Sequence, residues 1–269
     1  MTESKVIESN LGSMPTAKTL RHDLTALGIK NGDMLLVHTR LSKLGWVPGG
    51  PQTVAETLID CVGREGLICV PTFSSQNTDP ANWQAPPVAQ DWHDDIRATM
   101  PPFHPAYTPT RSMGAINDVI RNMPTAVRNG HPFSSFAAIG KNAKQMVSDF
   151  TVAFDFDEHS PLARLYDANA KVLFLGTGFA NCTCFHLGEY RAGKLEPAKG
   201  GTAMMVGGQR QWVSFDTLAY CDDDFETLGN AFAVHSQTLR KGKVGQADCR
   251  LFSIREAVDF AQKWISENR

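Results

Sequence analysis

The chain has 269 residues, 42% of them hydrophobic, which is enough to bury the core of one large domain. Its formal net charge is −2 and it has no block of lysines and arginines, so a nucleic-acid partner is not expected. No apolar run approaches the ~20 residues that span a bilayer, and residues 1–13 lack the apolar core of a secretion signal. We therefore expect a cytoplasmic protein without membrane contact, formed by a single domain over residues 1–269 with a loosely ordered tail over residues 1–14, whose partner is a small molecule.

The six cysteines do not suggest a disulfide framework in a chain of this length. Cys61, Cys69 and Cys249 lie in apolar patterns and are expected to be buried. Cys182 and Cys184 do not have the spacing of a structural zinc site. We expect these two thiols to line a pocket, and we expect no bound metal.

The first part of the chain predicts a βαβ unit. A helix is expected over residues 16–27, followed by a buried strand over residues 33–37 that ends at His38. A helix with proline in its first turn then covers residues 51–62, and a second strand covers residues 67–70.

The next segment, residues 71–113, is rich in proline and has little periodicity. A loop of this length in a compact domain is usually functional, so we expect it to form part of the site. Strands and helices then resume, with a helix over 115–123, an extended stretch over 126–128, a strand over 136–139, a short helix from 142, a helix over 160–166 and a strand over 172–175.

The last third of the chain has a different pattern. Gly207-Gly208, between residues 202–206 and 211–215, predicts a β-hairpin, and helices are expected over residues 224–239 and 255–268. The predicted fold class is α/β, a single domain with a mixed central sheet flanked by helices on both faces. Ligands of such sheets bind at the carboxyl ends of strands, where His38, Thr72 and Gly176 are expected.

The segment from Gly176 to Arg191 carries the strongest functional pattern. It reads as a turn that passes into a helix, with Thr183 as the expected N-cap and with His186 and Glu189 one turn apart. A carboxylate that holds one ring nitrogen leaves the other free to accept a proton, which is the arrangement of a general base. His-x-x-Glu also occurs by chance as an exposed helix pair, so the pattern alone does not establish catalysis.

An ordered set of motifs across nearly the whole chain resembles the aminoglycoside 3-N-acetyltransferase family. In chain order the motifs are Leu36-Val37-His38-Thr39-x-Leu41, Gly49-Gly50, Pro71-Thr72-x-Ser74, Pro109-Thr110-Arg111-x-Met113-Gly114, His131-Pro132-x-x-Ser135-Phe136-Ala137-Ala138-x-Gly140, Ser160-Pro161-Leu162 and Asn181-x-Thr183-x-x-His186-Leu187-x-Glu189. The resemblance implies a fold distinct from the common N-acetyltransferase superfamily.

The resemblance also implies an activity. Members move acetyl from acetyl-CoA to the 3-amino group of the deoxystreptamine ring of aminoglycosides, which gives antibiotic resistance. His186 would then be the base and Glu189 its orienting partner, in a direct transfer without an acyl-enzyme. Thr183, or backbone amides near Thr39, would stabilise the oxyanion, and His38 is either a second catalytic group or a strand-end histidine bonded to backbone.

The resemblance and the residue types suggest which groups bind the two substrates. Pantetheine and phosphates of coenzyme A are expected to meet amides, hydroxyls and a guanidinium from Thr39, Arg40, Leu41, Ser42, Thr72, Ser74, Arg111, Ser112, Met113 and Gly114. A polycationic amine requires carboxylates, and the acidic clusters at 155–158 and 222–226 are the main candidates. The residues expected to bind it are Asp79, Asp157, Asp223, Asp224 and Glu226.

Other readings remain open at this level. The same fold can act on a different small-molecule amine, or can bind acyl-CoA or an antibiotic without turnover. A hydrolase with Cys184 or a serine as nucleophile would need an elbow such as Gly-x-Ser-x-Gly, which the sequence lacks. Whether the protein is a monomer or a homodimer is also open.

Overall fold

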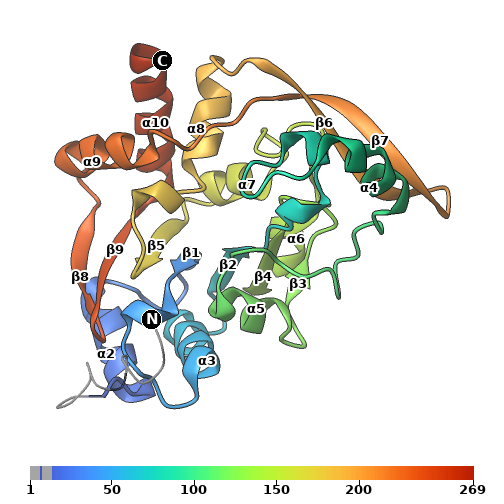
Figure 1. Cartoon of the computed structure of the whole chain (residues 1–269). Helices are drawn as coiled ribbons and strands as arrows, with labels where there is room; N and C mark the ends of the chain where they lie inside the picture. The colour runs from blue at the N-terminus through green and yellow to red at the C-terminus, as the bar shows by residue number, and fades with distance from the viewer. Residues whose placement is uncertain (1–6, 8–13) are drawn as a thin grey trace.

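Seven strands form a mixed central sheet in the part of the chain that this computed structural model describes, residue 7 and residues 14–269 (Figure 1). Across the sheet the strands are β3 (Val127–Arg128), β4 (Phe136–Gly140), β2 (Leu67–Pro71), β1 (Met34–Thr39), β5 (Lys171–Leu175), β9 (Ala247–Ser253) and β8 (Arg240–Val244). The predicted fold class is confirmed. The tail expected over residues 1–14 lies, apart from residues 7 and 14, outside the described residues.

The direction of the strands brings the predicted strand ends together. β1 pairs in parallel with both β2 and β5, whereas β4 and β9 run antiparallel to β2 and β5. The chain leaves β1 toward β2 on one side and reaches β5 on the other side, so the end of β1 is a topological switch point, where ligands of open α/β sheets bind. His38, Thr72 and Gly176 all lie at this edge.

Helices cover both faces of the sheet, and each face has its own apolar cluster (Figure 1). One face carries α2 (Ala17–Leu27), α3 (Gly50–Val62) and α5 (Ala115–Arg121), and the other carries α6 (Ala143–Val147), α7 (Pro161–Asp167), α8 (Phe185–Ala192), α9 (Phe225–His235) and α10 (Ile254–Asn268). Alternate residues of β1 enter the two clusters, Leu35 and Val37 on one face and Leu36 on the other. His38 therefore projects from the same face as Leu36, the face that carries α8.

Several helix ends follow the signals in the sequence. Thr16 caps α2 through a capping box, and Gly28 ends it with a left-handed φ of 115°. Pro51 lies in the first turn of α3, and the Ser160 hydroxyl caps α7. The βαβ unit formed by β1, α3 and β2 is confirmed.

The predicted hairpin is also confirmed. β6 (Pro197–Val206) and β7 (Gln209–Leu218) form a separate antiparallel pair that extends away from the central sheet (Figure 1). Both turn residues, Gly207 and Gly208, have positive φ, which glycine adopts without a steric penalty. The strands are longer than expected from the sequence.

The prediction was wrong for residues 236–239 and missed two strands in residues 240–253. The helix expected over residues 224–239 ends at His235, because Ser236 is extended and its hydroxyl bonds Glu256 and the next turn of the chain. The following residues form β8 and β9, joined by a turn at Gly245. β8 is an edge strand with mostly exposed, basic side chains, so it lacks the alternation that signals a strand.

Residues 71–113 are largely irregular, as expected, but they contain one unpredicted helix. Three short 3-10 helices cover Ser75–Asn77, Pro80–Asn82 and Gln90–Trp92, and α4 covers His93–Thr99. None of the α4 residues is buried, so its sequence has no apolar face that would mark a helix.

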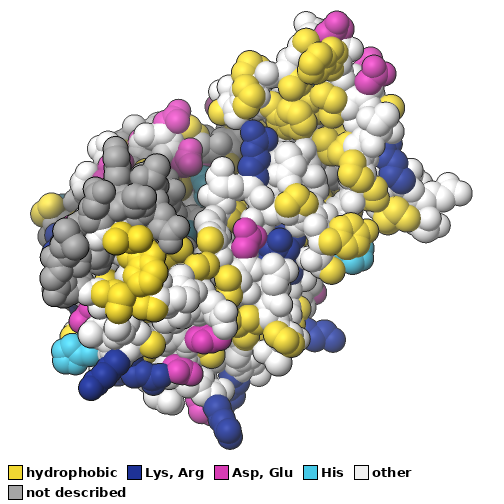
Figure 2. Space-filling model, turned by 60° about the horizontal axis from the view of Figure 1, so that its bottom comes forward, with side chains coloured by type: hydrophobic (Ala, Val, Ile, Leu, Met, Phe, Trp, Pro, Cys, Tyr) yellow, Lys and Arg dark blue, Asp and Glu magenta, His cyan; other side chains and the backbone are white. Residues whose placement is uncertain are grey.

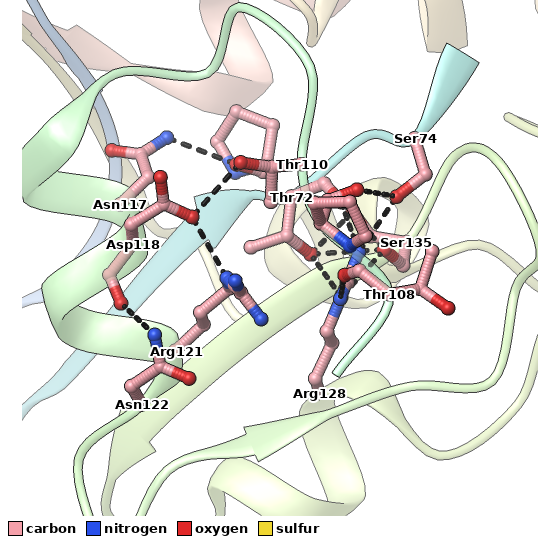
Figure 3. A network of polar contacts seen from close by, with 12 residues as sticks. Thr72, Ser74, Thr108, Thr110, Asn117, Asp118, Arg121, Asn122, Arg128 and Ser135 are labelled. Carbon is pink, nitrogen blue, oxygen red and sulfur yellow. Dashed lines mark hydrogen bonds and ion pairs between the residues drawn. The ribbon is translucent and has the colours of Figure 1, made fainter. Parts of the chain in front are cut away.

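A buried arginine ties this irregular segment to the sheet (Figure 3). The Arg128 guanidinium donates to the Thr72 carbonyl at 2.7 Å, to the Ser74 hydroxyl at 2.9 Å, to the Ser135 hydroxyl at 3.0 Å and to the Thr108 carbonyl at 2.6 Å. Only 9% of Arg128 is exposed. These bonds fix the chain on both sides of Phe73, which lines the cavity described next.

The face shown in Figure 2 has Lys, Arg, Asp and Glu side chains interspersed, without a large patch of one sign. Among the residues that the structure describes, no helix is both long and apolar enough to cross a membrane.

Candidate active site

An open cavity of about 190 Å³ lies at the carboxyl ends of β1, β2 and β5. Its walls are formed by the ends of these strands, by residues 112–117, by the loop over residues 177–183, and by residues of α8 and α9. His38, Thr183 and His186 all line it. The sheet topology therefore brings together groups that are far apart in the sequence, at the place where α/β sheets bind ligands.

His186 and Glu189 form a hydrogen-bonded pair on α8. Nδ1 of His186 lies 2.7 Å from Oε2 of Glu189, one helical turn away. The Glu189 side chain is fully buried, whereas 15% of the His186 side chain is exposed. Because Nδ1 is engaged by the carboxylate, Nε2 is the ring nitrogen left to exchange a proton.

The second oxygen of Glu189 is also fully satisfied. Oε1 accepts from the Cys221 amide at 2.9 Å and from the guanidinium of Arg269. A carboxylate can be buried at modest cost when charge-assisted hydrogen bonds replace its water. Glu189 is thus held rigidly with one oxygen aimed at His186.

Aromatic rings restrict the orientation of His186. Phe156 stacks on the imidazole with ring centroids 4.7 Å apart and an interplanar angle of 8°. The Phe225 centroid also lies 4.7 Å from the imidazole centroid, with an interplanar angle of 51°. Tyr220 meets the imidazole edge-on at 5.7 Å. These contacts confine the imidazole to one plane.

A glycine brings α8 close to α10. An added Cβ at Gly188 would lie 2.7 Å from Cβ of Ala261 on α10, which no side chain tolerates without movement. This contact explains a glycine inside the helix that carries His186 and Glu189.

The expected capping role of Thr183 is wrong. α8 begins at Phe185, and its N-cap is Cys184, without a side-chain capping bond. Thr183 precedes this position, is 8% exposed and lines the cavity. Thr183 therefore faces the cavity, but it does not cap the helix.

The two cysteines of this loop are buried, with their sulfur atoms 3.5 Å apart. Cys182 lines the cavity, while Cys184 lies outside the lining. Of the other cysteines, Cys69 and Cys249 are buried as expected and Cys61 is half-buried. Within the described part of the chain, no group of three or more His, Cys, Asp or Glu side chains is placed to hold a metal ion.

His38 lies inside β1, which continues one residue further to Thr39, so it does not end the strand as expected. It is 5% exposed, its Nε2 has no hydrogen-bond partner among the described residues, and its ring meets Phe174 edge-on. Burial lowers the pKa of His38 from 6.5 to about 4. His38 is therefore neutral at physiological pH.

The burial of His38 predicts a pH dependence of stability. Between pH 6.5 and about 4 the unfolded chain binds a proton at this side chain that the folded protein does not bind, so the free energy of unfolding falls as the pH falls. At about pH 5 this amounts to ~2 kcal/mol. In urea unfolding measured across the range, His38→Gln should lack the part of this decrease that His38 contributes and keep the part due to buried His131, whose pKa burial lowers to about 3. His22→Gln, at an exposed position, should keep it. Parallel curves for wild type and His38→Gln would contradict the prediction.

The residues predicted to bind coenzyme A separate into two groups. Thr39, Ser112 and Met113 line the cavity, and Gly114 follows them with a left-handed φ of 87°. The Thr39 hydroxyl donates to Asn117 at 3.4 Å, and Asn117 donates to the carbonyl of Pro71 at 2.9 Å.

The other predicted coenzyme residues lie outside the cavity lining. A short 3-10 helix, Leu41–Lys43, follows β1. It contains Leu41 and Ser42, and Arg40 is the residue before it. Thr72 and Ser74 are completely buried in the Arg128 network, so their hydroxyls are already engaged. The structure thus gives Thr72 and Ser74 a structural position instead of a place in the groove.

Arg111 is held by the irregular segment that precedes it. Its amide donates to the carbonyl of Phe73 at 2.8 Å, and its guanidinium donates to the carbonyl of Ala85 at 3.2 Å. It lies next to Ser112 but outside the cavity lining.

Most of the predicted substrate carboxylates have partners within the protein. Asp79 pairs with Arg97 at 2.8 Å, and Asp224 pairs with Arg269. Asp157 accepts from the His159 amide, and Glu226 accepts from the Ala180 amide. Asp223 is exposed.

Asp222, in the same acidic cluster, lines the cavity at the strand ends. A second cavity of about 500 Å³ lies under the base of the β6–β7 hairpin and is lined by Asp79, Asp155 and three aromatic rings, Phe133, Phe215 and Tyr220. Tyr220 also touches His186, so this second cavity lies beside the first. Burial raises the pKa of the Asp155 carboxyl to about 7, even though the Ser134 hydroxyl donates to it.

Sequence reasoning missed several residues of the site. Asn117 and Arg269 carry no local signal, because their partners lie 46 and 80 residues away. Asn181 belongs to the family-like motif but was given no role. His131 is buried, and its Nδ1 accepts from the Ser134 amide at 2.9 Å, so it stabilises the turn at Pro132.

Comparison with known proteins places this geometry in a family. Residues 36–266 match the family described as Aminoglycoside 3-N-acetyltransferase. The SPbeta prophage-derived aminoglycoside N(3')-acetyltransferase-like protein YokD of Bacillus subtilis (strain 168) is 42% identical over 98% of this chain and 97% of its own length. Aminoglycoside N(3)-acetyltransferase VII of Streptomyces paromomycinus is 35% identical over 94% of this chain and 92% of its own length.

Solved structures give the same result. The crystal structure of YokD superimposes with a TM-score of 0.95 at 41% identity, over 98% of both chains. AAC-IIIb in a binary complex with CoASH has a TM-score of 0.82 at 26% identity, over 95% of this chain and 97% of that one. AAC-VIa bound to sisomicin has a TM-score of 0.84 at 27% identity, over 94% and 98% of the two chains. The chain belongs to the aminoglycoside 3-N-acetyltransferase family of transferases.

Proposed function

We propose that this enzyme transfers acetyl from acetyl-CoA to the 3-amino group of the deoxystreptamine ring of aminoglycosides, and so gives antibiotic resistance. The observation that carries the proposal is the His186–Glu189 pair. Nδ1 of His186 lies 2.7 Å from Oε2 of Glu189, and His186 lines the cavity at the carboxyl ends of the central strands, in a chain that belongs to the family. Complexes of relatives with CoASH and with sisomicin support both substrate classes.

His186 is proposed as the general base. Glu189 holds Nδ1, and Nε2 takes a proton from the attacking amine. The amine nitrogen forms a bond to the thioester carbonyl carbon, the carbon–sulfur bond breaks, and coenzyme A leaves as a thiolate that recovers a proton. The transfer is direct and needs both substrates bound together. The Thr183 hydroxyl is the proposed donor to the oxyanion, supported by its place in the cavity lining.

Acetyl-CoA is proposed to enter along the side of the cavity formed by Thr39 and residues 112–114. Here the Asn117 amide orients the Thr39 hydroxyl at the cavity wall. Arg40, Ser42 and Arg111 lie next to this side and are the proposed contacts for phosphates.

The amine substrate is proposed to occupy the second cavity and to reach His186 past Tyr220. Asp155 provides a carboxylate for an ammonium group, whereas Asp79 is engaged by Arg97, and the aromatic rings provide apolar faces for sugar rings. A bound ammonium favours the ionised form of Asp155, because an opposite charge lowers the pKa of a buried carboxyl.

A different small-molecule amine is the second candidate substrate. The ion pairs of Asp79 and Asp224 and the bonds accepted by Asp157 and Glu226 leave fewer free carboxylates than a polycation would use.

Thiol release from acetyl-CoA by the purified protein, with and without a panel of aminoglycosides, tests the proposal. Release that depends on an aminoglycoside, with an acetylated product of the correct mass, supports both reaction and substrate class. Acetyl-CoA binding without release in the presence of any of them would contradict aminoglycoside specificity and favour another amine.

Glu189→Gln should lower kcat by about tenfold, less than loss of the base itself. The variant keeps the shape, but its amide cannot serve every partner. If the glutamine nitrogen faces Arg269 and the Cys221 amide, it places a donor against groups that also donate. If it faces His186, Nδ1 must accept, so the proton moves to Nε2, the nitrogen that should accept the proton of the amine. Steady-state kinetics measure kcat, with a thermal melt as the control for folding. A loss as large as that of His186→Ala would contradict the division of roles.

A further inference from the structure

The carboxylate of Glu189 is held from two elements that are distant in the sequence. His186 engages Oε2 from the same helix, and Arg269 engages Oε1 from beyond the last turn of α10, 80 residues away. The Glu189 side chain is fully buried and that of Arg269 is 21% exposed. The interaction is therefore shielded from bulk water. A shielded ion pair has more effect than an ion pair at the surface.

Arg269 also fixes the loop between β7 and α9. Its Nε donates to Asp224 at 2.8 Å and its Nη2 donates to the carbonyl of Cys221 at 3.0 Å. The side-chain hydrogen bond to Asp224 raises the pKa of Arg269 above its ordinary value, so the guanidinium stays charged. Between these contacts lies Asp222, which lines the active-site cavity. One guanidinium thus connects the His186–Glu189 pair to the loop beside it.

We propose that Arg269 is a positioning residue for the reaction, which holds Glu189 so that Oε2 stays aimed at Nδ1 of His186. The inference rests on the proposed function of the His186–Glu189 pair. The close packing of α8 on α10 at Gly188 supports it, because this contact fixes the register between the two helices that supply Glu189 and Arg269.

The charge of Arg269 has a predictable effect on His186. A cation beside Glu189 weakens the attraction between that carboxylate and the imidazolium, so it lowers the proton affinity of His186. The titratable and charged groups that face the pair from the surrounding elements are Arg269, Tyr220, Cys221, Asp222, Asp224 and Cys182. Of these, Arg269 provides the positive charge bonded directly to Glu189. Its removal should therefore move the acid limb of kcat/KM to higher pH.

The test is Arg269→Ala, compared with wild type and with Arg255→Ala. Arg255 lies on the same helix, is exposed, and donates to the carbonyl of Tyr166 without contact to the pair. Arg269→Ala should lower kcat by about tenfold and move the acid limb of kcat/KM to higher pH by about 1 unit, with the KM for acetyl-CoA changed less than twofold. Millimolar guanidinium should restore part of kcat and return the acid limb. Arg255→Ala should behave as wild type, with and without guanidinium.

An NMR titration of the His186 ring without substrate provides a readout that does not depend on turnover. At a fixed pH, ring signals of His186 that lie closer to their protonated position in Arg269→Ala than in wild type support the inference even if the natural acceptor differs from an aminoglycoside. An unchanged acid limb and an unchanged His186 titration, in a wild type that is active, would overturn the inference and leave the proposed function intact. Absence of turnover in wild type would count against the proposed function instead. If Arg269→Ala does not fold, Arg269→Lys replaces it. This variant retains the positive charge, so its acid limb should coincide with that of wild type. An acid limb displaced by about 1 unit or more in Arg269→Lys would overturn the inference.

Discussion

His186→Ala is expected to reduce kcat by about 100-fold or more and to leave acetyl-CoA binding nearly unchanged. The imidazole provides the proton acceptor at Nε2, whereas the predicted coenzyme side of the cavity is formed by Thr39 and residues 112–114. Turnover followed by thiol release gives kcat, and calorimetric titration with coenzyme A gives the binding constant.

The pH profile makes this prediction more specific. Without a base, the reaction depends on the small fraction of amine that is unprotonated in solution, so the residual rate should rise with pH beyond the point where wild type levels off. His235→Ala is the matched control, since His235 is exposed on α9, bonds a carbonyl of its own helix and stacks on Phe260, away from the cavity lining. Turnover of His186→Ala equal to that of the control would remove His186 from the mechanism.

Arg128→Met is expected to lower the free energy of unfolding by about 3–5 kcal/mol. The substitution removes the Arg128 donor from three carbonyls and three hydroxyls, among them those of Thr72, Ser74 and Thr108 (Figure 3). Burial lowers the pKa of Arg128 to about 10, which still leaves it charged at neutral pH. Urea unfolding monitored by fluorescence and circular dichroism measures the change.

Two further variants separate this effect from loss of charge alone. Arg128→Lys keeps the charge but cannot reach all the acceptors, so an intermediate loss is expected. Arg21→Met removes an exposed ion pair with Asp60 and should change stability by less than about 0.5 kcal/mol. A loss for Arg128→Met no larger than that for Arg21→Met would show that the network does not stabilise the segment around Phe73.

Elements defined by local signals were predictable. The caps at Thr16 and Ser160, the turn at Gly207-Gly208 and the i, i+3 spacing of His186 and Glu189 all depend on residues within a few positions of each other. Their geometry is set by backbone preferences and short-range hydrogen bonds, which the amino-acid order contains directly. The ordered motifs predicted the family for the same reason, because each is a short local pattern.

Elements that depend on long-range contacts were not predictable. β8 and β9 form only because β9 pairs with β5, and β8 then occupies an edge where its polar side chains are tolerated. Thr72 and Ser74 have the residue types of a binding groove, yet the fold places them beneath it, bonded to Arg128.

For the active site, the sequence by itself determined that an imidazole and a carboxylate would share one helical turn after a strand. Only the tertiary structure decided their environment. It buried Glu189, joined it to Arg269 across 80 residues, placed Asp222 in the cavity instead of Asp223, and removed His38 from water. Burial and electrostatic environment are properties of the packed whole, because they depend on groups brought together from all parts of the chain.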